Sequence, residues 1–427
     1  MGLEPIIMEF LDEINRKSEE RAEEIENWIN EQCQKVDVPL YTSVDLRISH
    51  HKITPVDTNV FPAGFNNLCP VFRRRTAQLF REHLIQSYPG AKRILIIPEL
   101  HTRNPYYWEN VYVIKSILES VGFLVEVGLV SDELYEDEVR FKTTNEEEIR
   151  AFRLKRDGDT VFVSGFTPDL ILINNDFSSK CPEILKGVRQ PVEPPVEIGW
   201  HTRRKSIHFD FYNKLACEVA GIIGIDPWII SIKTVSQSGV DFDDPADRQK
   251  VAQSVDSVLS ELRCEYKKRG VQEDPFLFLK SNSGTYGMAV ISVFSADEVR
   301  TLNAERRKQM RVSKGGRPVR DVVIQEGIPT SLRWGLETVG EPVIYLVKAK
   351  TAGGFLRLNK GKSEFDNLNT RGMEFSCLSF QKEDACKKGE CEEFFPLAYQ
   401  LIARTATIAA GYEIEKILKE GGCRNDG

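Results

Sequence analysis

The chain has 427 residues, more than one compact domain usually holds, so its length predicts two or more domains. Hydrophobic residues make up 41% and charged residues 28%, which is typical of a soluble globular protein. The formal net charge of −7 is spread along the chain and argues against a nucleic-acid partner, and no apolar run approaches the roughly 20 residues that cross a bilayer.

The first residues carry no signal-peptide pattern, and the nine cysteines follow no regular spacing. We therefore expect free thiols and a location in the reducing cytoplasm. Cys386 and Cys391 lie close together, but no second Cys or His pair accompanies them, so no zinc site is predicted there.

The first half of the chain predicts an α/β domain. Residues 4–35 carry apolar side chains at three- and four-residue steps, which indicates one long amphipathic helix, and the polar stretch at 43–68 is interpreted as loop-like. Residues 93–97, 109–121 and 123–127 then have the patterns of strand, helix and strand, and residues 169–173 add another strand. This order predicts a right-handed crossover and a partly parallel sheet.

The second half predicts an α+β domain. A proline-rich segment at 186–200 marks the expected boundary, which gives domains at 1–200 and 201–427. Helices are predicted at 208–224 and 251–269, and a last helix at 397–418. Between them, strands are predicted at 228–232, 276–280, 288–294, 321–325 and 343–347.

Several common nucleotide and hydrolase motifs are absent. Gly361-Lys362-Ser363 invites comparison with a phosphate-binding loop, but Leu356 occupies the position of the required first glycine. No Gly-x-Gly-x-x-Gly follows the strand at 93–97, and neither Gly-x-Ser-x-Gly nor His-Glu-x-x-His occurs.

One segment predicts an anion site. The strand at 276–280 ends on Lys280, a turn containing Ser283, Gly284 and Gly287 follows, and a second apolar strand begins. Glycines let backbone N–H groups approach an anion, and the lysine adds a positive charge. The alternative is an ordinary hairpin with one exposed lysine.

Two downstream segments could complete a nucleotide site. The strand at 322–325 leads into Gln325-Glu326-Gly327-Ile328, whose backbone could meet an adenine edge and whose carboxylate could meet a ribose; an ordinary strand end is the alternative. Arg357 follows two glycines and could neutralise a phosphoryl group, and the amides of Asn367 and Asn369 could ligate Mg²⁺.

The order of these features over about 205–375 resembles an ATP-grasp domain, in which two antiparallel layers hold the nucleotide between them. Asn213-Lys214-Leu215 and Asp226-Pro-Trp-Ile-Ile-Ser231 are similar to the first lysine-bearing helix and next strand of glutathione synthetases. This resemblance implies that Lys214 is the first ATP lysine and Lys280 the second, with Lys205 a rival for the first role.

Motifs in the first half narrow the family. Ser43-Val-Asp-Leu-Arg47, Pro55-Val-Asp-Thr-Asn59, Phe61-Pro-Ala-Gly-Phe-Asn-Asn-Leu68, Pro98-Glu-Leu-His-Thr-Arg-Asn104 and Gly199-Trp-His-Thr-Arg203 resemble the ATP-grasp type of glutamate–cysteine ligase found in some proteobacteria. The resemblance covers nearly the whole chain. It implies an ATP-grasp fold with an N-terminal α/β substrate domain, the cofactors ATP and Mg²⁺, small-molecule substrates and a possible homo-oligomer.

The reaction that the resemblance implies joins glutamate to cysteine. ATP phosphorylates the γ-carboxylate of glutamate, the cysteine amine attacks the acyl phosphate, and γ-glutamylcysteine forms as the first step of glutathione biosynthesis. The ATP site would comprise Lys214, Lys280, Ser283, Gly284, Gly287, Gln325, Glu326 and Ile328, with Lys280, Arg333 and Arg357 catalytic. An amino-acid pocket needs acids, amides and arginine, and Arg47, Asp57, Asn59, Asn66 and Asn67 supply that mixture.

The chain departs from glutathione synthetases at its end, because it finishes in a helix and lacks their final Glu-x-Asn metal ligands. Asn367 and Asn369 are the first choice as Mg²⁺ ligands, Glu337 and Glu341 the reserve, and Glu413 and Glu415 outside possibilities. Two alternatives remain open: glutathione synthesis or another carboxylate–amine ligation, and a non-catalytic nucleotide-binding module.

Overall fold

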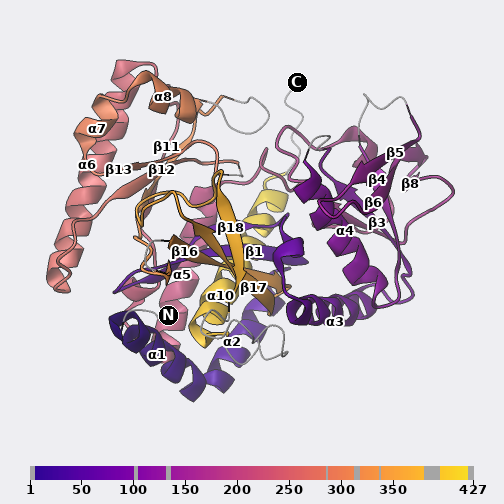
Figure 1. Cartoon of the computed structure of the whole chain (residues 1–427), viewed down its shortest axis with the longest axis horizontal. Coiled ribbons are helices and arrows are strands. Elements are labelled where there is room, and N and C mark those ends of the chain that lie inside the picture. The colour runs from indigo at the N-terminus through magenta and orange to yellow at the C-terminus, as the bar shows by residue number, and fades with distance from the viewer. Residues whose placement is uncertain are drawn as a thin grey trace.

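The computed structural model describes residues 5–100, 104–130, 136–284, 287–311, 318–335, 338–378 and 395–421 (Figure 1). The helices are α1 (Pro5–Glu20), α2 (Ala22–Lys35), α3 (Pro70–Ser87), α4 (Pro105–Glu119), α5 (Lys205–Ile223), α6 (Pro245–Lys268), α7 (Ala296–Arg300), α8 (Ala304–Arg311) and α10 (Leu397–Lys419). Short 3₁₀ helices are η1 (Phe65–Asn67), η2 (Glu183–Leu185) and η3 (Pro227–Ile229).

The strands belong to three larger sheets and one two-stranded ribbon. In chain order they are β1 (Tyr41–Ile48), β2 (Ile53–Asn59), β3 (Arg93–Pro98), β4 (Leu124–Leu129), β5 (Glu138–Lys142), β6 (Glu148–Arg153), β7 (Lys155–Asp157), β8 (Thr160–Phe162), β9 (Leu170–Asn174), β10 (Val192–Glu193), β11 (Thr234–Gln237), β12 (Leu277–Ser281), β13 (Val290–Val293), β14 (Val322–Glu326), β15 (Arg333–Trp334), β16 (Thr338–Val347), β17 (Lys350–Asn359) and β18 (Met373–Cys377).

The central sheet is antiparallel and has the order β18-β17-β16-β1-β2, with β15 paired to β16. The two faces of β1 differ because side chains alternate along a strand. Thr42 hydrogen-bonds Thr407 of α10 at 2.7 Å, so the even-numbered positions, including the fully buried Val44, Leu46 and Ile48, face that helix. The odd-numbered positions, which include Asp45 and Arg47, face the opposite side.

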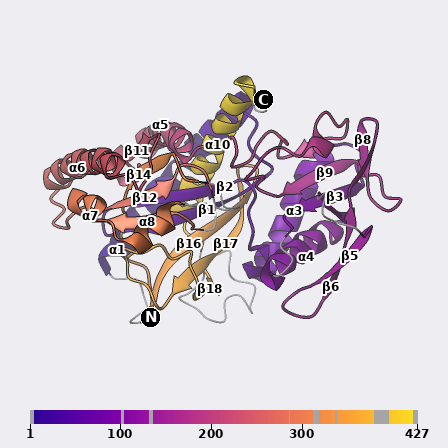
Figure 2. The same ribbon diagram turned by 90° about the horizontal axis from the view of Figure 1, so that it is seen from above.

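A smaller antiparallel sheet has the order β11-β14-β12-β13 and packs against α6. Leu277 and Leu279 of β12 enter a hydrophobic core with Val255 and Leu259 of α6. The alternate β12 residues, Phe278 and Lys280, therefore point away from α6. Figure 2 shows this small sheet and its helices on the opposite side of the central sheet from the α/β unit.

The α/β unit is built on the sheet β10-β9-β3-β4-β6-β5, whose strands lie between residues 93 and 193. Strands β9, β3 and β4 are parallel neighbours, and α4 connects β3 to β4, so the predicted strand–helix–strand crossover is confirmed. Helices α3 and α4 lie beside this sheet at the right of Figure 1. The helices predicted at 208–224, 251–269 and 397–418 are also present.

Four expectations were wrong. The predicted single helix at 4–35 is two helices separated at Arg21, whose backbone has φ −113° and ψ 21°. The stretch at 43–68 contains the central strands β1 and β2 rather than only loops. Residues 228–232 form no strand, because Asp226 caps the 3₁₀ helix η3 through the backbone N–H of Trp228. Cys377 is disulfide-bonded, whereas the five other described cysteines form no disulfide.

The central sheet crosses the expected domain boundary near residue 200. Strand β1 pairs with β16 over Tyr41–Asp45, so residues 41–59 lie in the same sheet as residues 338–377. The division into domains at 1–200 and 201–427 stays a prediction. Cys386 and Cys391 lie outside the described residues. Among the described helices, none combines the length and the apolar character that a membrane span requires.

Candidate active site

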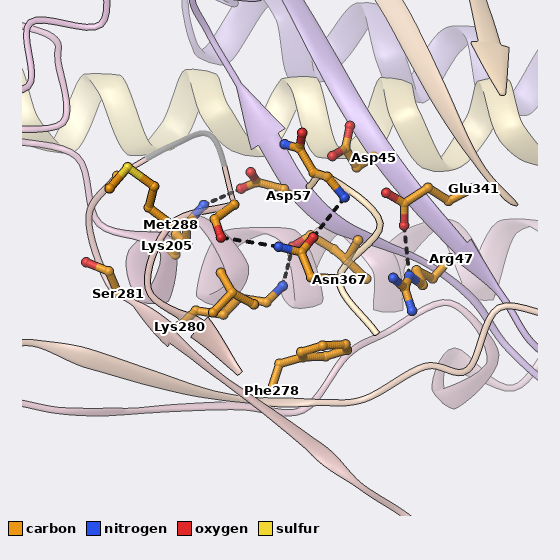
Figure 3. Close-up of a pocket in the computed structure, with 15 residues that line it drawn as sticks. Asp45, Arg47, Asp57, Lys205, Phe278, Lys280, Ser281, Met288, Glu341 and Asn367 are labelled. Atoms are coloured by element: carbon orange, nitrogen blue, oxygen red, sulfur yellow. Dashed lines mark hydrogen bonds and ion pairs between the residues drawn. The ribbon is translucent and has the colours of Figure 1, made fainter. Parts of the chain in front are cut away.

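A small cavity of about 60 Å³ lies where the central sheet faces the small sheet (Figure 3). The central sheet contributes its polar face, the small sheet contributes β12 and β13, and α5 contributes its first residue. The lining residues are Asp45, Arg47, Val56, Asp57, Lys205, Phe278, Lys280, Ser281, Gly284, Gly287, Met288, Val290, Glu341, Asn367 and Asn369. Three carboxylates and three cationic side chains thus surround one small space.

A second cavity of about 990 Å³ adjoins the first, and Asp45, Asp57 and Asn369 line both. It lies between the central sheet and the α/β unit and is more acidic than the small cavity. Five carboxylates line it, with two arginines, Arg357 and Arg371. The carboxylates are Asp45, Asp57, Glu99, Glu109 and Asp176.

Lys280 is a buried cation at the small cavity. Its Nζ donates hydrogen bonds to the carbonyl oxygen of Val56 at 3.1 Å and to Oε1 of Gln325 at 2.6 Å, and both acceptors are uncharged. Burial, together with the nearby Lys205 and Arg47, lowers the pKa of Lys280 to about 7. Among the residues that the structure describes, these neutral groups are its only hydrogen-bond acceptors, and a buried ammonium of this kind beside a cavity suits an anionic ligand.

The other lysine at this cavity is Lys205, not Lys214. Lys205 begins α5, is 7% exposed, and forms an ion pair with Asp57 of β2. Although burial acts in the opposite direction, Lys205 and Lys280 lower the pKa of Asp57. Lys214 is exposed farther along α5, where its Nζ lies 5.7 Å from the ring centre of Phe211, and it lines neither cavity.

Arg357 joins two carboxylates, the buried Glu341 and the half-buried Asp45. Its NH1 group donates to Asp45 and to Glu341, each at 2.7 Å, while its Nε has no hydrogen-bond partner in the described part of the chain. Burial raises the pKa of Asp45, with Arg357 opposing that effect, whereas Arg47 and Arg357 outweigh burial at Glu341 and lower its pKa. The structure therefore brings Arg357 to the large cavity, next to the residues shared with the small one.

Arg47 has little capacity left for a substrate. Its Nε donates to Glu341 at 2.9 Å, its NH1 to the carbonyl oxygens of Ile328 and Glu364, and its NH2 to that of Asp366 at 2.5 Å. These bonds fix the 364–366 segment against β1. Arg47 lines the small cavity, but these hydrogen bonds indicate a structural role for its guanidinium group.

The glycine turn and the two predicted amides lie together at the small cavity. Gly287 has φ +64°, and a Cβ there would lie 2.4 Å from the carbonyl oxygen of Asn369. Asn367 donates from Nδ2 to the carbonyl oxygen of Gly287 at 3.3 Å, as Figure 3 shows for its side chain. Only glycine allows this close approach. Ser283 lies in the same turn but not among the lining residues, and its carbonyl oxygen accepts a bond from Ser281.

The connector predicted to meet adenine and ribose is already bonded within the protein. Glu326 is 1% exposed and pairs with Lys52 at 2.8 Å, and its backbone N–H donates to Lys233. The carbonyl oxygen of Ile328 accepts from Arg47, and the side chain of Gln325 accepts from Lys280 while its Nε2 has no partner. None of the three lines either cavity.

The remaining predicted residues divide between the large cavity and the surface. Asn59, Asn66 and Asn67 line the large cavity together with Asp57. Arg333 on β15 is 38% exposed, pairs with Glu364 at 3.2 Å, and lines neither cavity. The structure therefore brings together most of the predicted substrate residues and leaves Arg333 apart from them.

Comparison with known proteins identifies the family. The glutamate–cysteine ligase family model matches residues 15–414. The chain belongs to the glutamate–cysteine ligase family. A solved structure, the "putative gamma-glutamylcysteine synthetase" from Methylobacillus flagellatus KT, is 34% identical, with 97% of this chain and 98% of that chain covered and a TM-score of 0.85.

A D-alanyl-alanine synthetase A from Vibrio cholerae is only distantly similar: it is 11% identical, with 74% of this chain and 81% of that chain covered and a TM-score of 0.33. No curated protein matches the sequence. The family establishes this protein as an enzyme that ligates glutamate and cysteine.

The described residues of this ligase contain no group of three or more His, Cys, Asp or Glu side chains that could hold a metal ion. Glu341, a reserve candidate, is paired with Arg47 and Arg357. Glu413 is buried against Arg203, and Glu415 pairs with Lys419 near the end of α10. Glu337 lies outside the described residues. Asn367 and Asn369 remain the predicted amides that face the small cavity.

The sequence interpretation gave no role to Asp45, which lies at the centre of the ligase's charge network. A signal for it was present, because Ser43, Asp45 and Arg47 alternate with apolar residues in the pattern of a strand with one polar face. Glu99 and Asp176 were missed in a similar way. They follow the carboxyl ends of β3 and β9, where ligands bind in parallel sheets.

Proposed function

We propose that this glutamate–cysteine ligase is ATP-dependent and that its central and small sheets form the two layers of an ATP-grasp clamp. The observation that carries the proposal is the convergence of Lys205 and Lys280, from different elements, on one cavity beside Gly287. Two cations and a glycine turn suit the phosphates of a nucleotide. In this proposal Lys205 replaces Lys214 as the first phosphate lysine.

The residues at the small cavity fit a phosphate group. Lys280 donates to the neutral acceptors Val56 and Gln325, and Gly287 leaves room that a side chain would fill. The cavity's size of about 60 Å³ suits a phosphate rather than a whole nucleotide. For the base, we retain the Gln325–Ile328 connector as the candidate, since the side-chain Nε2 of Gln325 is buried without a partner.

The chemistry requires activation of a carboxylate, which is a poor electrophile. Transfer of the terminal phosphoryl group of ATP to the glutamate γ-carboxylate gives an acyl phosphate and ADP. The cysteine amine then attacks the acyl carbon, a proton leaves the nitrogen, and inorganic phosphate departs. The protein's contribution to such a reaction is mainly positioning and charge stabilisation.

The large cavity is the proposed amino-acid site. Its 990 Å³ falls within the range of small-molecule sites, and it joins the small cavity at Asp45, Asp57 and Asn369. Asp57, Asn59, Asn66 and Asn67 offer acceptors and donors for ammonium and carboxylate groups. Arg357, at the junction, would neutralise the acyl phosphate as it forms.

The proposal includes a Mg²⁺ ion that is held chiefly by the phosphates of the nucleotide. Such an ion commonly has only one or two ligands from the protein. The side-chain oxygens of Asn367 and Asn369 are the candidates, since both residues line the small cavity. When bound, the ion would offset phosphate charge.

The test is release of inorganic phosphate by the purified protein with ATP and Mg²⁺. We expect release to require glutamate and cysteine together. Release that instead required γ-glutamylcysteine and glycine would support glutathione synthesis, and an absence of turnover with either pair would support a non-catalytic module. When cysteine is omitted, each enzyme molecule should form at most one ADP, because the acyl phosphate then has no amine to react with.

Nucleotide binding should also depend on pH through Lys280. Below its pKa of about 7 the ammonium is charged in the free enzyme, and phosphates should raise that pKa on binding. Affinity for ATP should therefore fall as pH rises above 7, by up to about tenfold per pH unit. The measurement is the dissociation constant of ATP between pH 7 and 9 by calorimetry.

The matched variant for this measurement is Lys280→Arg, because a guanidinium group stays charged throughout this range. Its affinity should be nearly independent of pH, while titration of the nucleotide contributes equally to both proteins. Equal slopes in the wild-type protein and the arginine variant would remove Lys280 from the nucleotide site.

A further inference from the structure

The start of α5 is attached to α10, to β2 and to the residue after β12, although the helix lacks a side-chain cap of its own. Arg204 is the N-cap residue and its side chain makes no capping hydrogen bond. The first N–H groups of a helix have no partner within the helix, so a buried start needs acceptors from elsewhere. Here Lys205, the proposed phosphate lysine, is the first helical residue.

Glu413 of α10 supplies one of these acceptors. Its Oε1 accepts the backbone N–H of Arg204 at 3.1 Å, and its Oε2 accepts from NH2 and Nε of Arg203 at 2.7 and 3.2 Å. Both side chains are buried, with exposures of 0% for Glu413 and 1% for Arg203. The carboxylate also lies at the end of the helix where negative charge is favourable.

Arg203 extends the same connection to β2. Its NH1 and NH2 groups donate to the carbonyl oxygen of Thr58, each at 3.3 Å. Thr58 follows Asp57, the ion-pair partner of Lys205. Thr58, which accepts from Arg203, and Asp57, which pairs with Lys205, are therefore adjacent along β2.

Asn282 provides the third attachment. Its carbonyl oxygen accepts from the backbone N–H of Lys205 at 2.8 Å, and its Oδ1 accepts from that of Ser206 at 2.9 Å. Asn282 comes two residues after Lys280 at the end of β12. The two proposed phosphate lysines are thus linked through the backbone of one short segment.

Arg203 is the one cationic partner of Glu413 among the described residues. His208 lies 3.7 Å away, but burial, together with the nearby Arg203, lowers its pKa to about 3, so its ring is neutral near pH 7. Removing the charge of Glu413 would leave Arg203 without its counter-ion and Arg204 without a charged acceptor. Neither Arg203 nor Glu413 lines either cavity, so neither can contact a ligand there directly.

We infer that Arg203 and Glu413 are positioning residues, through which the last helix of the chain fixes Lys205 at the small cavity. The inference rests on the proposed function, because it takes Lys205 to contact the nucleotide. Small displacements of a charged group that acts on a phosphate reduce turnover strongly. The pair therefore controls nucleotide use without touching the nucleotide.

A double-mutant cycle with Lys205 tests the inference. Glu413→Gln removes the charge but keeps the side chain's size, and it should lower kcat/KM for ATP about tenfold or more, mainly by raising KM for ATP. In a Lys205→Ala background the same substitution should change kcat/KM less than about threefold, because its effect passes through Lys205. All variants are measured at a temperature where circular dichroism reports them folded.

The matched control is Glu26→Gln. Glu26 also forms an ion pair that involves α10, because its Oε2 accepts from Arg404 of that helix at 2.7 Å. Its side chain, however, is 54% exposed. It should leave kcat/KM for ATP unchanged. If Glu413→Gln does not fold, Arg203→Lys takes its place in the cycle, because it keeps the charge while losing the contacts to Thr58.

The outcomes separate the inference from the proposed function. Equal effects of Glu413→Gln in both backgrounds, or a folded variant with the wild-type kcat/KM, would overturn the positioning role while leaving Lys205 in the site. A Lys205→Ala variant that binds and uses ATP like the wild-type protein would instead remove Lys205 from the site, and with it the proposed nucleotide contact.

Discussion

Replacing Lys280 with alanine should lower kcat/KM for ATP by about 100-fold or more, the effect usually seen when a group that stabilises developing charge is removed. Lys280 is buried at the small cavity and lies beside the glycine turn. Its ammonium group contacts Gln325 and the backbone of Val56, neither of which can replace a positive charge. The measurement is steady-state phosphate release at saturating glutamate and cysteine.

Lys214→Ala is the informative comparison for this variant. The sequence pattern assigns Lys214 to the phosphates, but its side chain is exposed and lines neither cavity, so its loss should change kcat/KM for ATP less than about threefold. A large loss with Lys214→Ala and a small one with Lys280→Ala would reverse the proposed site.

Local patterns were sufficient for the elements with strong periodicity. The alternation of β3, α4, β4 and β9 and the long helices α5, α6 and α10 followed from apolar spacing and from prolines and glycines at their ends. The strand–turn–strand around Lys280 was also predictable, because it is formed by residues close together in the sequence.

The central sheet was not predictable by the same means. Strand β1 pairs with β16, about 300 residues away, and nothing local reports that pairing. Its polar side chains suggested a loop, whereas in the fold Asp45 is matched by Arg357 and Arg47 by Glu341. Long-range charge pairs of this kind allow a strand to be both polar and buried.

In the candidate site, too, some features could be predicted from local sequence and others depend on distant residues. The family motifs located Asp57, Asn59, Asn66 and Asn67, which do line one cavity. The choice between Lys205 and Lys214 depended on which face of α5 meets β2, and the role of Arg47 depended on the distant 364–366 segment. Both are tertiary facts, so residue type and spacing could not settle them.

Arg357→Ala should be the most destabilising of the substitutions considered, costing about 3–5 kcal/mol of unfolding free energy at pH 7. It leaves the half-buried Asp45 without its cation and the buried Glu341 with Arg47 alone. Turnover should be lost as well, because Arg357 is the proposed partner of the acyl phosphate. Arg357→Lys keeps a charge and should retain more stability, but a single ammonium cannot reproduce a guanidinium's geometry.

The pH dependence of the stability that Arg357→Ala loses identifies the cause of that loss. Burial already raises the pKa of Asp45 in the wild-type protein, and without Arg357 it should rise further, while the lowered pKa of Glu341 should also rise. The folded variant then binds more protons than the folded wild-type protein, so its stability relative to the wild-type protein should improve as pH falls from 7 toward 5. Arg140→Ala is the control, since Arg140 also pairs with two carboxylates, Glu138 and Glu148, but is 59% exposed and should cost less than about 1 kcal/mol. Urea unfolding at pH 5, 6 and 7 measures all three proteins; a deficit for Arg357→Ala that stays constant with pH would mean that lost packing, and not unpaired carboxylates, is responsible.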